Sequence, residues 1–214
     1  MNRHILTVDG IDGSGKSYLA QELVDTATAA GVRSILVRVD DFRLPISWDL
    51  VADELQAYYN DYFDLTQVTK CLDAFMHGAA SFAVPTFDSV TERMTGHRPL
   101  TFDGAQLLVL EGVFIARVAE HRDVTRVYIH TSEAEARRRI MERDQKKGRT
   151  AEDVARRIDQ RYFAAQRRYA EQHDPLASAQ VIIAHETLGA PTRSRGDVGS
   201  LHPAARAALA CYAD

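Results

Sequence analysis

The residues best suited to chemistry lie near the N-terminus, in the stretch Gly10-Ile-Asp-Gly-Ser-Gly-Lys-Ser17. This stretch matches the pattern G-x-x-x-x-G-K-[ST] of a phosphate-binding loop at every fixed position. The glycines of such a loop let backbone N–H groups point at phosphate oxygens, its lysine reaches the β- and γ-phosphates, and its last hydroxyl binds Mg²⁺. We therefore predict an ATP site here, with Lys16 as a catalytic cation and Ser17 as a metal ligand. The residues predicted to bind ATP in this stretch are Gly10, Asp12, Gly13, Ser14, Gly15, Lys16, Ser17 and Tyr18.

Acidic residues follow two further apolar runs that are typical of strands. Asp40 and Asp41 come directly after residues 34–39, and Glu111 ends the run 106–111. Because chemistry gathers at the carboxyl ends of strands in open α/β sheets, Asp40 is a candidate general base or metal partner. A solvated loop with an Asx turn is the alternative at this position. Glu111 has the place of a Walker B acid, which holds Mg²⁺ or orients a water on it.

Arginines and lysines concentrate between residues 137 and 149, just after the predicted start of a helix. Ser132 and Glu135 have the spacing of a capping box, which predicts that a helix begins there. Such a run usually forms a solvated face, but here it also fits a mobile lid, about residues 139–150, that closes cations over transferring phosphates. The lid residues predicted to touch phosphates or acceptor are Arg139, Arg143, Lys147 and Arg149.

Aromatic residues concentrate in the segment 43–65, where acids are interleaved with them. This composition suits a sugar or base pocket, and it equally suits core packing, so both interpretations stay open. Residues 81–102 are expected to form a small β insertion, because Pro85 disfavours a central position in the main sheet. Asp88, Glu92 and Arg93 lie near the turn of this insertion.

The elements that must position these groups are an alternation of strands and helices, which indicates a three-layer α/β fold. We expect five parallel strands near residues 4–9, 34–39, 106–111, 124–130 and 179–184. A length of 214 residues suggests one domain, which we place at 1–190, followed by a C-terminal extension at 191–214.

Composition excludes some classes of protein. The net charge of -4 gives no drive toward nucleic acid or anionic membrane, and no apolar run approaches the ~20 residues of a membrane span. The first strand leaves no room for a signal peptide, and the two isolated cysteines fit a reducing compartment, so we expect a cytoplasmic protein. A homo-oligomer is an open possibility.

Taken in order, these landmarks resemble the uridine kinase-like branch of the P-loop kinases, which also contains phosphoribulokinase and one type of pantothenate kinase. The resemblance runs from about residue 4 to about residue 185. It is carried by Gly10–Ser17, Asp40-x-Phe42, Tyr59-Asn-Asp-Tyr-Phe-Asp64, Pro85-x-Phe-Asp88, Leu110-Glu-Gly112 and the arginines from Arg138 to Arg149.

The resemblance implies a P-loop NTPase fold with strand order 2-3-1-4-5, and ATP and Mg²⁺ as cofactors. It implies that Asp40 accepts the proton of a 5′-hydroxyl and helps hold Mg²⁺, and that Glu111 is a metal acid. It also implies that Arg139 and Arg143 are catalytic, and that Lys147 stands where the family often has an arginine. The residues implied to contact the acceptor are Asp40, Phe42, Tyr59, Asp61, Phe87, Glu92, Arg93 and Arg149.

The chain departs from the family in the part that reads the base. Where uridine–cytidine kinases have a tyrosine and a histidine that read the pyrimidine, this chain has Phe87 and Glu92. Phe87 can stack but cannot donate a hydrogen bond, and Glu92 reverses the donor pattern.

The sequence therefore predicts transfer of the ATP γ-phosphoryl group to a primary hydroxyl, with a nucleoside 5′-hydroxyl as the expected acceptor. The alternatives are a kinase of pantothenate, nicotinamide riboside or a sugar phosphate, and a nucleotide-dependent regulatory NTPase. A GTPase switch would carry an N-K-x-D motif, which the sequence lacks.

Overall fold

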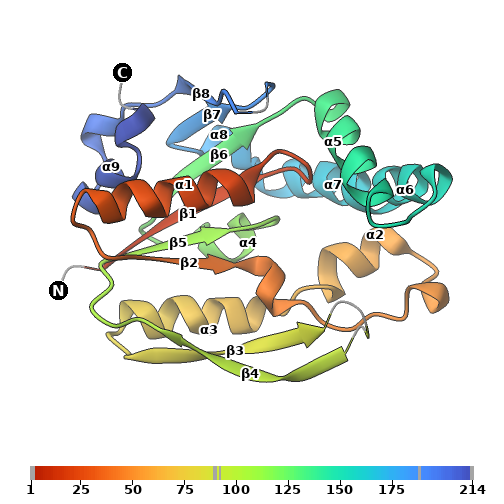
Figure 1. Cartoon of the computed structure of the whole chain (residues 1–214), viewed down its shortest axis with the longest axis horizontal. Coiled ribbons are helices and arrows are strands. Elements are labelled where there is room, and N and C mark those ends of the chain that lie inside the picture. The colour runs from red at the N-terminus through yellow and green to blue at the C-terminus, as the bar shows by residue number, and fades with distance from the viewer. Residues whose placement is uncertain (1–2, 89–90, 92, 188, 213–214) are drawn as a thin grey trace.

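The computed structural model describes residues 3–88, 91, 93–187 and 189–212 of the chain. Its main sheet has the strand order β2-β5-β1-β6-β7-β8, and its first five strands run parallel (Figure 1). The strands of this sheet are β1 (His4–Gly10), β2 (Ser34–Arg38), β5 (Leu107–Glu111), β6 (Thr125–His130), β7 (Val181–Ala184) and β8 (Thr192–Arg195). The parallel part has the order 2-3-1-4-5 that the family resemblance implied.

The sixth strand corrects the prediction of a five-stranded sheet. β8 pairs antiparallel with β7 at the edge. Its sequence, Thr-Arg-Ser-Arg, is polar and mostly exposed, so no hydrophobic alternation marks it as a strand. Backbone pairing holds such an edge strand, and charged side chains protect it from pairing with other chains.

Helices cover both faces of the sheet and make the three layers in Figure 1. The longer helices are α1 (Lys16–Ala29), α3 (Leu65–Met76), α5 (Glu133–Gln145), α6 (Ala151–Arg157) and α7 (Phe163–His173). Shorter helices are α2 (Glu54–Gln56), α4 (Ala116–Ala119), α8 (Pro175–Ser178) and α9 (Pro203–Ala208). No helix in the described ranges has the length and apolar character needed to cross a bilayer.

Alternation along the central strands explains how both faces are filled. In β5, Leu107 and Val109 pack with α1 and α9, whereas Leu108 and Leu110 pack on the opposite face with α3. Successive side chains of a strand point to opposite faces, and both faces are covered here, so the strand is apolar throughout. Burying one such side chain stabilises the fold by about 1.5–3 kcal/mol.

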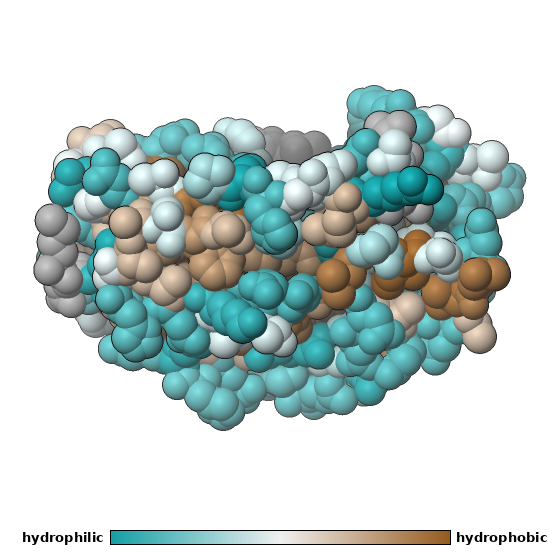
Figure 2. Space-filling model, turned by 90° about the horizontal axis from the view of Figure 1, so that it is seen from below, coloured by the Kyte–Doolittle hydropathy of each residue, from teal (hydrophilic) through white to brown (hydrophobic). Residues whose placement is uncertain are grey.

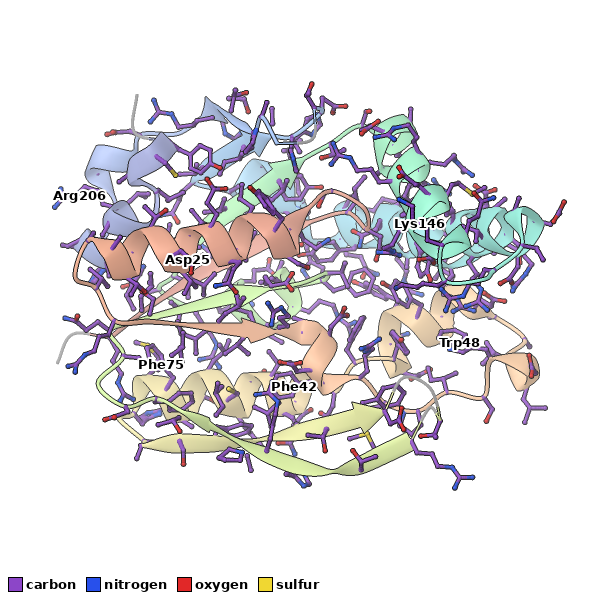
Figure 3. All side chains as sticks on the ribbon, viewed as in Figure 1. Asp25, Phe42, Trp48, Phe75, Lys146 and Arg206 are labelled. Atoms are coloured by element: carbon purple, nitrogen blue, oxygen red, sulfur yellow. The ribbon has the colours of Figure 1, made fainter. Side chains whose placement is uncertain are left out.

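Two strands form the predicted β insertion. Within the described residues, β3 (Ser81–Asp88) and β4 (Arg93–Thr101) pair with each other alone, antiparallel and beside α3. Phe42 and Phe75 are fully buried in the part of the core that lies on the same side of the sheet as β3 and β4 (Figure 3).

Seen from below, the surface carries a band of apolar residues between hydrophilic ones (Figure 2). The homo-oligomer that the sequence left open stays a prediction.

The fold brings the candidate site together at one edge of the sheet. β2, β5 and β1 are neighbours, with Glu111 opposite Arg38 on one side and Val8 on the other. The segments that follow these strands therefore lie side by side. They carry Asp40, Glu111 and the phosphate-binding loop.

Candidate active site

The phosphate-binding loop connects β1 to α1 with the backbone that its glycines permit. Gly13 and Gly15 have φ of 80° and 93°, in the left-handed region that favours glycine. A Cβ on Gly13 would lie 2.6 Å from the carbonyl of Ala136, so α5 can pass close above the loop only because this residue is glycine. Ser14 is fully buried, and the Lys16 ammonium donates to the carbonyl of Ile11 at 2.7 Å.

Two side chains brace this loop from the outside. His185, just after β7, is buried and donates from Nδ1 to the carbonyl of Ser14 at 2.8 Å. Arg139 donates to the same carbonyl at 3.2 Å and to the carbonyl of His185 at 2.7 Å, while Glu135 accepts from its Nε. The guanidinium of Arg139 is therefore committed to carbonyls and a carboxylate, which suits positioning of the loop better than the predicted contact with phosphate.

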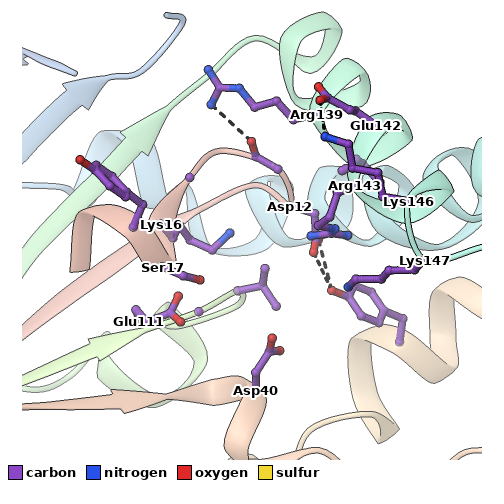
Figure 4. A pocket seen from close by; sticks show the side chains of 17 residues that line it. Asp12, Lys16, Ser17, Asp40, Glu111, Arg139, Glu142, Arg143, Lys146 and Lys147 are labelled. Carbon is purple, nitrogen blue, oxygen red and sulfur yellow. Dashed lines mark hydrogen bonds and ion pairs between the residues drawn. The ribbon is translucent and has the colours of Figure 1, made fainter. Parts of the chain in front are cut away.

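A cavity of about 600 Å³ opens beside the loop, and we call it the nucleotide-side cavity. Lys16, Ser17, Asp40 and Glu111 line it on one side, while Arg143 and Lys147 approach from the other (Figure 4). Tyr18 also lines the cavity and is 63% exposed. The structure thus brings together most of the residues that the sequence predicted for ATP.

The three predicted metal ligands supply oxygen donors to this cavity. Glu111 is nearly buried, accepts a hydrogen bond from the hydroxyl of Ser17, and lies 3.5 Å from the guanidinium of Arg38. Asp40 is exposed and lines the same cavity. Carboxylate and hydroxyl oxygens are what Mg²⁺ binds in phosphoryl-transfer sites, where it keeps several waters and uses few protein ligands. These residues therefore fit a magnesium ion.

Burial shifts the acidity of two carboxyl groups at the site. It raises the pKa of Glu111, an effect that Asp40 reinforces and the Lys16 ammonium opposes. It also raises the pKa of Asp12, against the opposing charges of Lys16 and Arg143. The hydroxyl of Tyr58 donates to Asp12 at 3.1 Å and so favours its ionised form.

The predicted lid, residues 139–150, comprises the end of α5 and the turn after it. Its centre is Asp144, which is 1% exposed. This carboxylate accepts from Nε of Arg143 at 2.7 Å and lies 3.1 Å from Nη1 of Arg149. Glu142 pairs with Lys146 at 2.7 Å. The lid is thus held by two acids, and its opening and closing stay a prediction.

A second cavity, about 160 Å³, adjoins the first, and we call it the acceptor-side cavity. Asp40 and Asp12 line both cavities, as do Tyr58, Arg143 and Lys147. Arg149, which the sequence placed at the acceptor, lines only the second. The Asp40 side chain therefore lies where the two cavities meet.

Three residues predicted to contact the acceptor lie elsewhere. Phe42 is fully buried in the core, so it cannot reach a ligand. Tyr59 points away from both cavities, because its hydroxyl donates to Gln172 at 2.7 Å and its ring packs under Arg117. Asp61 is exposed and lines neither cavity.

The β insertion also differs from its predicted part in the acceptor site. The Arg43 guanidinium lies 5.4 Å from the centre of the Phe87 ring, so a cation covers the face expected to stack on a base. Arg93 is exposed on β4 and lines neither cavity. Glu92 lies outside the described residues, and its predicted role stays a prediction.

The sequence left the aromatic residues of segment 43–65, Tyr58 and Tyr62 among them, open between a pocket and core packing, and it missed Arg161 and Tyr162 at the acceptor-side cavity. Tyr58 and Tyr62 come from a π-helical turn at Ala57–Asp61 and its end, and Arg161 and Tyr162 come from another at Ile158–Tyr162. A π turn inserts one residue relative to an α-helix and often marks a functional site. It shifts which tyrosine faces inward, so Tyr58 and Tyr62 take the place that the sequence gave to Tyr59.

The model of one protein family matches most of the chain: the phosphoribulokinase/uridine kinase family model aligns with residues 5–185. The chain belongs to this family. No curated protein sequence matches it significantly.

Solved structures with the same fold include several kinases of this kind. A possible uridine kinase from Bacillus stearothermophilus is 21% identical, with a TM-score of 0.67 over 85% of this chain and 89% of that one. A putative fructose transport system kinase from Silicibacter sp. TM1040 is 18% identical, with a TM-score of 0.67 over 79% and 85%. Phosphoribulokinase from Rhodobacter spheroides is 12% identical, with a TM-score of 0.61 over 86% and 71%.

Membership makes this chain a kinase of the phosphoribulokinase/uridine kinase type. At such low identity, likeness to these structures establishes the fold and leaves the acceptor to be argued from the site itself.

Proposed function

We propose that the chain transfers the γ-phosphoryl group of ATP to a primary hydroxyl of a small-molecule acceptor. The observation that carries this proposal is the position of Asp40, whose side chain lines both cavities. ATP with Mg²⁺ would fill the nucleotide-side cavity, and the acceptor would fill the other. The hydroxyl to be phosphorylated then meets the γ-phosphate beside a carboxylate.

The chemistry asked of the protein is positioning and charge neutralisation. The acceptor oxygen forms a bond to the γ-phosphorus, the bond from that phosphorus to the bridging oxygen of ADP breaks, and the hydroxyl proton passes to Asp40. Lys16 and the N–H groups of the loop stabilise charge on the phosphates, because the helix N-terminus and an ammonium face the same point.

The cations of the lid face the transferring phosphoryl group from the side opposite the phosphate-binding loop. Arg143 and Lys147 line both cavities, so they can reach the transferring group from opposite the loop. Ser17, Asp40 and Glu111 would hold Mg²⁺, which supplies charge neutralisation between the β- and γ-phosphates when it is bound. Arg139 would act as a positioning residue for the loop.

The first acceptor to weigh is the nucleoside that the sequence suggested. A nucleoside 5′-hydroxyl is supported by the family and by the possible uridine kinase among similar folds. Against it stand three residues: Phe42 is buried in the core, Tyr59 points away from the cavities, and Arg43 covers a face of Phe87. These positions favour the wider class of small hydroxylated metabolites.

The test is ADP formation from ATP with and without candidate acceptors, including uridine, cytidine, purine nucleosides, nicotinamide riboside, pantothenate and sugar phosphates. A kinase releases ADP at a rate that rises and saturates with one of them, and the product carries the phosphate. Hydrolysis at a rate that no acceptor changes would instead support the regulatory NTPase.

A further inference from the structure

The acceptor-side cavity is unusual in its lining: each described residue that borders it is either charged or a tyrosine. Among these described residues, five cationic side chains outnumber three acids, Asp12, Asp40 and Asp144. The cations are Arg43, Arg143, Lys147, Arg149 and Arg161. A cavity for an uncharged base usually offers apolar surface with a few placed polar groups. This cavity has the opposite character.

The acids that line the cavity balance only part of this positive charge, while Glu54, which does not line it, pairs with Arg161. Asp144 is one carboxylate shared by Arg143 and Arg149. The ammonium of Lys147 forms no ion pair with any residue in the part of the chain that the structure describes. Like charges held this close repel one another, and partial burial weakens their screening by water and salt. An anion in the cavity would relieve that repulsion.

Two of the arginines are fixed in place before any ligand arrives. Arg161 is 3% exposed, donates from Nε to Glu54 at 2.9 Å, and stacks at 3.4 Å from the centre of the Trp48 ring. Arg43 donates from Nε to the carbonyl of Asp40 at 2.9 Å and is hydrogen-bonded to Tyr62. Planar guanidinium groups held rigidly are well suited to phosphate or carboxylate, which they bind through paired N–H donors.

We propose that the acceptor carries an anionic group, a phosphate or a carboxylate, in addition to the hydroxyl that is phosphorylated. This inference rests on the proposed kinase function and narrows its substrate class. The hydroxyl lies at Asp40, where the two cavities meet. The anionic group lies among Arg43, Arg149 and Arg161, which line only the acceptor-side cavity.

Matched acceptors test this directly. ADP formation is measured with D-ribose 5-phosphate against D-ribose, and with D-glycerate against glycerol, with uridine as a neutral nucleoside. We expect turnover of an anionic acceptor with kcat/KM at least ~100-fold above its neutral partner, because two or more charge-assisted hydrogen bonds are lost in the neutral one. The two pairs separate a phosphate from a carboxylate. Efficient turnover of uridine or another neutral acceptor, with none of the anions used, overturns the inference and leaves the kinase function standing.

If no acceptor of the panel is turned over, a binding measurement tests the inference instead. The probe is inorganic phosphate, titrated at constant ionic strength into protein saturated with Mg²⁺ and an unreactive ATP analogue, with thermal unfolding as the readout. We expect a saturable rise in Tm that falls by at least half in Arg149→Gln and in Arg43→Gln. Arg206→Gln is the control, because it removes the same charge from α9 at the far end of the molecule (Figure 3). No saturable rise, or equal rises in all four proteins, overturns the inference.

With an anionic acceptor in hand, the same variants give a kinetic check. Arg149→Gln should lower kcat/KM for that acceptor ~10–100-fold while KM for ATP changes little, since Arg149 does not line the nucleotide-side cavity. An unchanged kcat/KM would contradict its assignment.

Discussion

The nucleotide-side and acceptor-side cavities share a wall but are built differently. One wall of the first is shaped by backbone, namely the left-handed glycines and the helix N-terminus of the phosphate-binding loop, and Asp40, Glu111 and residues of the lid complete it. The second is shaped by side chains from segments far apart, among them Arg43, Tyr58, Arg149 and Arg161. We infer that this fold positions the phosphoryl donor largely through the backbone of its loop and leaves the acceptor to individual side chains.

The largest effect is expected at Asp40, where the two cavities meet. Asp40→Asn should lower kcat by ~10²–10⁴-fold with little effect on ATP affinity, because it removes a positioned general base. Steady-state kinetics and nucleotide binding measure the two effects. Asp41→Asn is the matched control, since Asp41 accepts from Arg98 of β4 at 2.8 Å and lines neither cavity. If Asp41→Asn were the crippling change instead, the base would be assigned one residue too early.

Lys16→Ala tests the nucleotide side alone. Loss of an ammonium that stabilises developing charge should cost ~10²–10³-fold in kcat. The far-ultraviolet circular dichroism should be unchanged, because within the described residues the Lys16 side chain makes a single hydrogen bond, to the carbonyl of Ile11. A variant that keeps most of its kcat would remove the phosphate-binding role of this loop.

Asp9, at the end of β1, links the phosphate-binding loop to the stability of the fold. It is buried beneath the loop, where it accepts from the N–H of Gly10 and the hydroxyl of Tyr169, and burial raises its pKa from 3.8 to about 6. An acid that holds its proton more tightly when folded contributes stability below pH 3.8, and this contribution is lost as the pH rises through about 6.

Asp9→Asn should therefore raise the free energy of unfolding at pH 7.5 by roughly 1–3 kcal/mol, with a smaller gain at pH 5. Urea denaturation at both values measures it. Asp25→Asn on the exposed side of α1 is the control and should change little. A variant less stable than the wild type at pH 7.5 would show that the ionised carboxylate is favourable there.

The smallest expected effect is in the lid, which borders both cavities. Amide hydrogen exchange across residues 139–150 should slow severalfold when ATP analogue and acceptor are both bound, because phosphate oxygens relieve repulsion among its cations. The segment around Asp25 serves as an internal reference. Equal protection with and without ligands would mean that the segment is not a lid.

The sequence predicted the nucleotide side of the molecule better than the acceptor side. The five parallel strands were predictable, because buried strands are continuous apolar runs and the motif fixes the first turn. β8 was not, since four polar residues held by backbone pairing leave no pattern. In the site, Lys16, Ser17, Asp40 and Glu111 were predictable from motif and strand ends.

The acceptor side was predicted poorly for a physical reason. The π turns at Ala57–Asp61 and Ile158–Tyr162 change the register of side chains in a way that helical spacing does not reveal. Phe42 matched a family motif but is used as core. Arg43, next to it, had no motif, and its role depends on Asp40, Tyr62 and Phe87 folding around it.

We propose that each of the two cavities holds one of the two substrates, and that these meet at Asp40. The most direct measurement is a crystal structure of the chain with Mg²⁺, an unreactive ATP analogue and an acceptor that supports turnover. We expect the γ-phosphate in the nucleotide-side cavity and the reactive hydroxyl within ~2.6–3.2 Å of the Asp40 carboxylate. An acceptor bound outside the acceptor-side cavity, with its hydroxyl out of reach of Asp40, would contradict this proposal.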